Sequence, residues 1–218
     1  MKEPERLLES LVTGKISRIG QLEISLSENG FILCHREDVG RIDLQQCQVD
    51  DAVEIAKFDD KDRYRPLKTA PTLRRGWKIF ANNSEEASRA IDAIYPGRLA
   101  VLHTFKGGRL STTSLRETLN RQSGMYRVAA KISDEQVDAL VGNFCRSDGG
   151  CLRTILWKRD ERKTVPSAKL PPEKFDPAAD QMGKGETCIP LLCQEACNLL
   201  VAACRDMVKM EGAASSAP

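Results

Sequence analysis

The residues most able to do chemistry in this chain of 218 residues are its eight cysteines. Four of them form two spaced pairs: Cys145 and Cys151 are separated by five residues, and Cys193 and Cys197 stand four positions apart. Cysteine thiolates bind zinc ions and iron–sulfur clusters. The two pairs therefore predict a metal site with four thiolate ligands.

Spacing alone leaves three interpretations of these pairs open. Structural zinc sites usually take two Cys-x-x-Cys pairs, and neither pair has that spacing. The cysteine run of bacterial ferredoxins is absent as well. The spacing favours a [4Fe–4S] cluster over zinc by a small margin, and reduced core cysteines without metal are the third interpretation. Cys188 and Cys204 receive no role, whereas Cys34 and Cys47 are expected to be structural.

The first cysteine pair is expected to follow a helix. Ser133 and Gln136 form the pattern of a capping box, which predicts a helix that ends near Cys145. A diglycine at 149–150 allows the chain between the two cysteines to curl around a metal without steric cost. The apolar residues within 152–157 are expected to form a wall beside the site.

The second cysteine pair is expected to lie on a helix. Cys193 and Cys197 precede a stretch that is typical of a helix, and their spacing of four predicts that both sulfurs lie on one face of its first turns. Pro190 suits the entrance of such a helix. The insert between the pairs is rich in charge and proline over residues 158–177, which is typical of a loop.

The sequence before the cysteines predicts sheet and helix together. Alternation within residues 21–34 around an Asn-Gly turn predicts a β-hairpin. Residues 84–95 are typical of a capped helix, and the continuous apolar run 99–105 predicts a central strand. Residues 64–77 contain two prolines and a glycine, which indicates an extended segment that exposes Trp77 beside two arginines.

The expected fold class is α+β. A mixed sheet-and-helix domain over residues 1–125 is followed by a mainly helical, four-cysteine cluster-binding region over residues 126–211 and a disordered tail over 212–218. A chain of this length can bury one core or two small ones.

Charge is distributed unevenly along the chain. Residues 61–78 contain seven basic side chains and one acidic, and residues 98–127 contain six basic and one acidic, although the formal net charge is only +2. Two basic segments on an otherwise acidic chain predict a face for an anionic partner. The alternative is that these charges lie on separate solvated faces. Lys106 and Arg109 flank a diglycine whose amides suit an anion, with a tight turn as the alternative.

Composition argues against several classes of protein. No apolar run reaches membrane-spanning length, and the N-terminus lacks the apolar core of a signal peptide, so a cytoplasmic protein with reduced cysteines is expected. Only two histidines are present, which argues against a histidine-built metal centre. No nucleophile–base pair or paired carboxylates stand out, so an enzyme is not indicated. Aromatic residues make up 5 % of the chain and no helix-turn-helix pattern is evident, so nucleic acid is not the expected partner.

Longer motifs connect the basic segments with the cysteine pairs. They are Thr69-Ala70-Pro71-x-Leu73-Arg74-x-Gly76-Trp77, His103-x-Phe105-Lys106-Gly107-Gly108-Arg109-Leu110, Arg121-Gln122-x-Gly124-Met125-Tyr126, Cys145-x5-Cys151-Leu152-Arg153-x-x-Leu156-Trp157 and Cys193-x-Glu195-x-Cys197-Asn198-Leu199-Leu200. Together they cover roughly residues 15–207 and resemble the C-terminal region of long-form sirohydrochlorin cobaltochelatases.

The resemblance implies an N-terminal α+β stabilising domain and a C-terminal domain that binds one [4Fe–4S] cluster through Cys145, Cys151, Cys193 and Cys197. The chelatase domain that precedes this region in the long proteins is not found in this sequence. An accessory or electron-transfer iron–sulfur protein of tetrapyrrole and cobalamin metabolism is therefore expected, with a chelatase or redox protein as its partner.

The resemblance also suggests a ligand for the basic segments. Sirohydrochlorin-type tetrapyrroles carry many carboxylates, which arginine binds in a bidentate manner. Arg74, Lys106, Arg109 and Arg121 are the expected contacts of such an anionic tetrapyrrole. The alternative functions are a zinc-binding structural module, a redox-responsive regulator that binds nucleic acid, and a tetrapyrrole-modifying or metal-inserting enzyme that uses the cluster.

Overall fold

The computed structural model describes residues 6, 8, 9, 12, 16–122, 127–146, 150–163, 165 and 186–214. These residues divide into two compact units. The first unit contains the described residues up to Arg109 together with residues 186–191. The second contains the described residues of 110–165 together with those from Leu192 onward.

This division falls earlier in the chain than the boundary expected at residue 125. Helix α5 (Leu115–Gln122) lies in the second unit, because its buried Leu115 and Leu119 belong to the hydrophobic core of that unit. The core of the second unit is assembled from segments that are far apart in the sequence. The residues around 110 therefore do not indicate by themselves that the second unit begins with α5.

The first unit is built on a six-stranded mixed sheet. Its strands lie in the order β4-β5-β3-β2-β1-β7. They are β1 (Ile16–Ile19), β2 (Leu22–Ser27), β3 (Gly30–His35), β4 (Gln45–Cys47), β5 (Trp77–Ala81) and β7 (Glu186–Ile189). β1 pairs with β7, and β4 with β5, in parallel, whereas the other neighbours are antiparallel.

The predicted β-hairpin is confirmed as β2 and β3. Its register pairs Leu22 with His35 and Ser27 with Gly30. Gly30 has a φ of +139°, and a Cβ there would lie 2.2 Å from the carbonyl oxygen of Ala81. Only glycine therefore fits where the hairpin turn approaches the end of β5.

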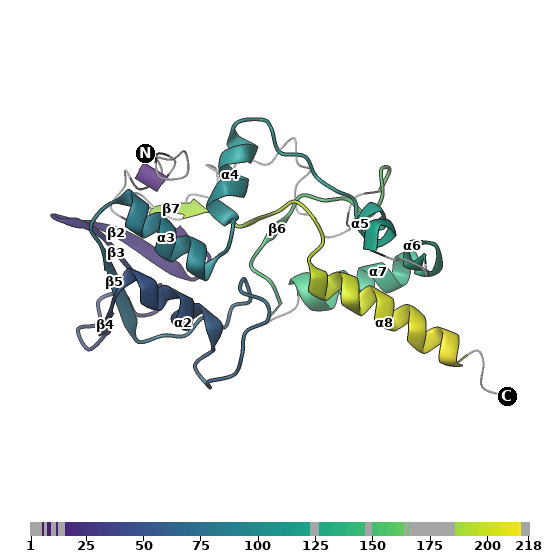
Figure 1. Ribbon diagram of the computed structural model, residues 1–218, viewed down its shortest axis with the longest axis horizontal. Coiled ribbons are helices and arrows are strands. Elements are labelled where there is room, and N and C mark those ends of the chain that lie inside the picture. The colour runs from purple at the N-terminus through teal and green to yellow at the C-terminus, as the bar shows by residue number, and fades with distance from the viewer. Residues whose placement is uncertain are drawn as a thin grey trace. The chain divides into compact units, whose positions relative to one another are not determined.

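Helix α3 (Ser84–Ile94) covers one face of this sheet, with α2 (Ala52–Lys57) beside it (Figure 1). The N-cap of α3 is Asn83, whose side chain accepts a hydrogen bond from the Glu86 amide. The buried face of α3 consists of small and aliphatic side chains: Ala87, Ala90, Ile91 and Ile94. A 3₁₀ turn, η1 (Val49–Asp51), precedes α2.

Residues 99–105 form helix α4 (Arg98–Lys106), so the strand predicted there is wrong. Gly97, with a φ of +73°, turns the chain after α3 and starts a second helix. Leu99 and Leu102 are buried three positions apart, as on one face of a helix. A short apolar run does not by itself distinguish a central strand from a partly buried helix.

The segment 64–77 contains no helix or strand before its last residue, but Trp77 does not share an exposed surface with its neighbouring arginines. Trp77 begins β5, is 2 % exposed and donates a hydrogen bond from Nε1 to the carbonyl oxygen of Arg74 at 2.6 Å. The predicted exposure of Trp77 is wrong because β5 pairs with strands on both sides and its alternate residues point into the core. Buried Arg65 donates to three backbone carbonyl groups.

The turn between β1 and β2 packs closely against Tyr95. The buried Tyr95 Oη accepts a hydrogen bond from the Gln21 amide at 2.9 Å. Gly20 in this turn has a φ of +58°, and a Cβ there would lie 2.7 Å from Tyr95 Oη and 2.9 Å from Leu191 Cδ1. The turn is therefore fixed between the end of α3 and the segment that follows β7.

The second unit is mainly helical. After α5 come α6 (Val128–Lys131), α7 (Asp134–Val141), a π-helical turn η2 (Gly142–Arg146), the short parallel strands β6 (Thr154–Ile155) and β8 (Leu192–Cys193), and α8 (Asn198–Ala214). Because α8 includes residues 212–214, these are helical and not part of a disordered tail. Residues 215–218 lie outside the described residues.

The predicted fold class is confirmed as α+β, with a mixed sheet-and-helix part followed by a mainly helical part. Among the helices that the structure describes, none combines the length and the apolar character needed to cross a membrane.

Candidate metal centre

Cys145 is positioned by α7. The Ser133 side chain accepts a hydrogen bond from the Gln136 amide, and the Gln136 side chain accepts one from the Ser133 amide, so the predicted capping box is confirmed. The turn η2 continues α7 and carries Cys145, which packs half-buried against the core of the second unit. Residues 147–149 of the loop to the next cysteine lie outside the described residues.

Cys193 lies in a strand and not in a helix. β8 pairs with β6, with Ile155 opposite Cys193, and the Leu156 amide donates to the Cys193 carbonyl oxygen at 2.9 Å. Cys197 lies immediately before α8, whose first residue is Asn198. The prediction that both sulfurs share one face of a helix is wrong, because pairing with the remote β6 holds Cys193 in an extended conformation.

The sulfur of Cys193 is buried and hydrogen-bonded. Cys193 is 7 % exposed. Trp157 Nε1 donates to its Sγ at 3.3 Å, and Arg153 Nη1 lies 4.0 Å from it. The thiol itself donates to the Glu195 carbonyl oxygen at 3.2 Å. Burial raises the pKa of Cys193, whereas the charge of Arg153 and the hydrogen bond from Trp157 lower it, so these two donors favour the thiolate form that binds metal.

All four predicted ligands lie in the second unit. Cys193 belongs to its hydrophobic core, and Cys145 and Cys197 pack against that core. Cys151 is close enough for its charge to raise the pKa of Cys193. Within the described ranges, no three Cys, His, Asp or Glu side chains converge as ligands of one metal ion. In a [4Fe–4S] site each cysteine binds a different iron, so the four thiolates surround the cluster instead of meeting at one ion. Four cysteines in one unit, with N–H groups directed at the sulfur of one of them, fit such a cluster.

An ion-pair network links the segment after β6 to the start of α7. The carboxylate of Asp134, the first residue of α7, pairs with three cations: Arg116, Arg159 and Lys163. The hydrogen bond from Lys163, with a further one from Arg116, lowers the pKa of Asp134 to about 2. The network therefore fixes the segment that follows Trp157 against the helix that precedes the first cysteine.

The other four cysteines are distributed over both units. Cys34 lies in β3, Cys47 in β4 and Cys188 in β7, whereas Cys204 is fully buried on α8. Burial raises the pKa of Cys34 and of Cys204 to about 11. Thiols with such pKa values stay protonated at neutral pH, as expected of structural residues.

The basic residues predicted to contact an anion are divided between the units. Arg74, Lys106 and Arg109 lie in the first unit and Arg121 in the second. Arg109 folds back over Gly107, and its Nη2 lies 3.1 Å from His103 Nε2. Arg121 forms an ion pair with Glu117 on the same helix. Two of the four cations are therefore already engaged within the chain.

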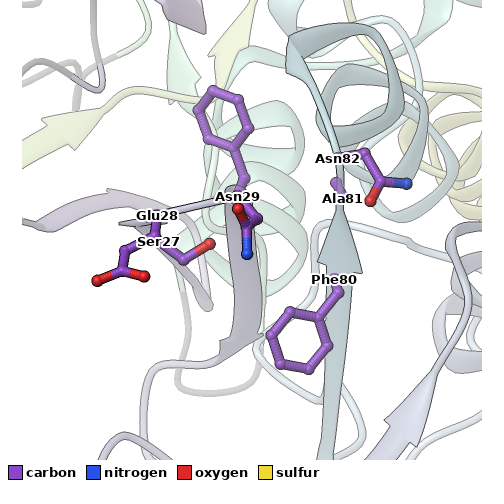
Figure 2. Close-up of a pocket in the computed structure, with 7 residues that line it drawn as sticks. Ser27, Glu28, Asn29, Phe80, Ala81 and Asn82 are labelled. Carbon is purple, nitrogen blue, oxygen red and sulfur yellow. The ribbon is translucent and has the colours of Figure 1, made fainter.

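A hollow of about 340 Å³ lies in the first unit beside the hairpin turn (Figure 2). It is lined by Ser27, Glu28, Asn29, Phe31, Phe80, Ala81 and Asn82. This lining contains an acidic residue but neither cysteine nor basic side chain. The hollow therefore suits neither an iron–sulfur cluster nor an anionic tetrapyrrole.

Known families match the two halves of the chain. Residues 107–206 match the family described as a 4Fe-4S iron-sulfur cluster binding domain, and residues 4–106 match the DR2241 stabilising domain. Each half of the chain is thus similar to one of these two domain families. The [4Fe–4S] cofactor and the resemblance to an iron–sulfur region with its stabilising domain are thereby confirmed.

This chain is similar to DR2241 from Deinococcus radiodurans, whose crystal structure is known. The match has a TM-score of 0.72 and 27 % identity, and it covers 95 % of this chain and 41 % of DR2241. DR2241 is described as a multi-domain protein with structural similarity to chelatases and with two additional novel domains. This chain thus spans about two-fifths of the length of DR2241. No curated protein matches it.

Two residues of the 4Fe-4S cluster binding domain were missed as hydrogen-bond donors. The sequence predicts that Trp157 belongs to an apolar wall, and its burial is confirmed, whereas the sequence indicates no role for Arg153. The signal for Trp157 was its indole N–H, which needs an acceptor when the ring is buried. Arg153 could not be found from the sequence, because its proximity to Cys193 depends on the pairing of β6 with β8.

Proposed function

We propose that the 4Fe-4S cluster binding domain holds one cluster through Cys145, Cys151, Cys193 and Cys197. The observation that carries this assignment is the distribution of cysteines: these four lie in the unit that matches the cluster-binding family. The fifth cysteine of that unit, Cys204, is fully buried and has a pKa raised to about 11. Cys204 lies within helix α8, in the hydrophobic core of the unit, and we leave it out of the proposed ligand set.

The proposed role is electron transfer or support of a partner, not catalysis. A cluster bound by four cysteines leaves no iron position open for a substrate, and when bound it supplies one-electron chemistry. The residues of this chain bind it, exclude water from one sulfur and donate hydrogen bonds to that sulfur. Because DR2241 has structural similarity to chelatases, we place the partner among the chelatases and redox proteins that act on tetrapyrroles.

Anaerobic purification tests the cluster assignment. Iron, sulfide and zinc are measured, and visible spectra are recorded before and after dithionite. We expect about four irons and four sulfides per chain and a broad absorption that bleaches on reduction. Serine variants of each of the four ligands should lose iron, whereas Cys34→Ser and Cys188→Ser should retain it. One zinc and no sulfide per chain would contradict the proposal.

The second part of the proposal is that Arg74, Lys106, Arg109 and Arg121 each contribute to the affinity for an anionic tetrapyrrole. Arginine forks suit carboxylates, and each charge reversal to Glu replaces attraction by repulsion. We expect the combined reversal of Arg74, Arg109 and Arg121 to weaken binding of a sirohydrochlorin-type tetrapyrrole, measured by absorption titration, more than tenfold, which corresponds to about 1.4 kcal/mol. Reversal of the exposed Arg205 on α8 is the control. Equal affinity in both variants would remove these residues from the site.

A further inference from the structure

Trp157 directs its indole N–H at a predicted cluster ligand inside a protein core. The side chain is 2 % exposed, and its Nε1 lies 3.3 Å from Cys193 Sγ. Cys193 is itself buried, so bulk water does not compete for this hydrogen bond. A hydrogen bond in such a low-dielectric environment acts more strongly on charge at the acceptor than one at the surface.

The fold holds this donor rigidly in place. On one side of Trp157, the Leu156 amide donates to the Cys193 carbonyl oxygen at 2.9 Å. On the other side, the Lys158 carbonyl oxygen accepts from the Leu115 amide at 2.8 Å. The backbone on both sides of Trp157 is therefore fixed, one side to the strand that contains Cys193 and the other to α5.

Arg153 adds a positive charge near the same sulfur. Its Nη1 lies 4.0 Å from Cys193 Sγ, and it precedes β6 by one residue. The pairing of β6 with β8 therefore places one neutral donor and one cation from a single short segment at one ligand sulfur.

We propose that Trp157, assisted by Arg153, raises the reduction potential of the [4Fe–4S] cluster through the sulfur of Cys193. This inference rests on the proposed function. When one electron enters from an external one-electron donor, negative charge increases on the cluster and its thiolates. N–H groups already directed at Cys193 Sγ stabilise that more negative state more than the oxidised one. Trp157 and Arg153 thus tune the site without ligating iron.

The chain offers a matched control, because its two tryptophans are both 2 % exposed and both donate from Nε1. Trp157→Phe removes the donor to Cys193, and Trp77→Phe removes a donor to a backbone carbonyl of the other unit. Full-length proteins loaded with iron and sulfide are titrated anaerobically with redox mediators. We expect the midpoint potential to shift to a more negative value in Trp157→Phe and to remain unchanged in Trp77→Phe.

A second variant tests the charge separately. Arg153→Gln removes the positive charge and keeps a polar side chain, and Arg205→Gln is its control on the exposed surface of α8. We expect a smaller negative shift for Arg153→Gln than for Trp157→Phe, because the contact is longer, and no shift for Arg205→Gln. Unchanged potentials in both test variants, with full iron content, would overturn the inference.

If Trp157→Phe does not bind a cluster, the same hydrogen bond can be tested in the wild-type protein. Exchange of the indole proton for deuterium should shift an iron–sulfur stretching frequency in the resonance Raman spectrum, and absence of a shift would overturn the inference. Wild-type protein without iron and sulfide would instead refute the proposed function, so the two failures are distinguishable.

Discussion

At Gly20 the main chain and two side chains leave no room for a larger residue. A methyl group there would meet Tyr95 Oη and Leu191 Cδ1 at less than 3 Å, and the φ of +58° disfavours any residue with a Cβ. We expect Gly20→Ala to lower the free energy of unfolding of the first unit by about 2–5 kcal/mol, the sum of the conformational and overpacking costs. Urea unfolding followed by Trp77 fluorescence in a Trp157→Phe background measures this change.

Gly40 is the control for that substitution. It has a φ of +82°, but a Cβ there would meet no atom within 4 Å. Gly40→Ala should therefore cost only the conformational part, about 1–2 kcal/mol. Equal effects of the two variants would show that the contact of Gly20 with Tyr95 does not constrain the turn.

The two tryptophans show how far the burial of a single side chain can be predicted from the residues next to it. Trp157 lies in an apolar run, and its burial was predicted correctly. Trp77 follows arginines and a glycine, so its surroundings indicated exposure, yet the strand that it begins is central enough to bury it. Burial of an isolated residue depends on which strands pair beside it, and local composition does not contain that information.

The ion-pair network around Asp134, the first residue of α7, contributes a stability that depends on pH. The pKa of this carboxyl is lowered to about 2 in the folded protein by the hydrogen bond from Lys163 and that from Arg116, against 3.8 when unperturbed. Because the pKa is lower in the folded state, the ionised carboxylate stabilises the protein at pH values above the unperturbed pKa. This contribution is lost as pH falls from about 4 towards 2. We expect Asp134→Asn to be less stable than wild type at pH 6 and to approach it near pH 2.

Unfolding of cluster-free protein, followed by Trp157 fluorescence in a Trp77→Phe background, tests this dependence. Asp206→Asn is the control, since Asp206 is exposed and lies 4.0 Å from Lys209 in its ion pair. A constant difference between Asp134→Asn and wild type across this pH range would contradict the assignment of the acid sensitivity to Asp134.

Elements with strong local signals were predictable. The hairpin was recognised from its alternation and its Asn-Gly turn, and the capping box located α7. The failures have a common physical cause: residues 99–105 and Cys193 adopt conformations selected by tertiary contacts. Leu99 and Leu102 pack on one side of a helix, and Cys193 pairs with a strand that precedes it by almost forty residues.

At the scale of the whole molecule, each unit contains one of the two tryptophans, so each can be followed separately. All four proposed ligands belong to the second unit. A group that binds only the folded state stabilises the unit that holds it. We therefore expect removal of the cluster to move the Trp157 transition to lower urea concentration and to leave the Trp77 transition in place.

Urea titrations of cluster-loaded and cluster-free single-tryptophan variants measure this difference. Equal shifts of both transitions would show that the cluster stabilises the chain as one cooperative body instead of the 4Fe-4S cluster binding domain alone.

The pairing of β1 with β7 sets an order of events during synthesis on the ribosome. Ile16 pairs with Glu186, so a nascent chain has an unpaired sheet edge until residue 189 leaves the exit tunnel. The two cysteines that complete the proposed ligand set emerge only afterwards, within the next eight positions. Delivery of a cluster to the complete proposed ligand set is therefore confined to the time after Cys197 has emerged. The assembly machinery would encounter a chain whose first sheet is already closing, and premature loading onto Cys145 and Cys151 alone would give a half-coordinated cluster.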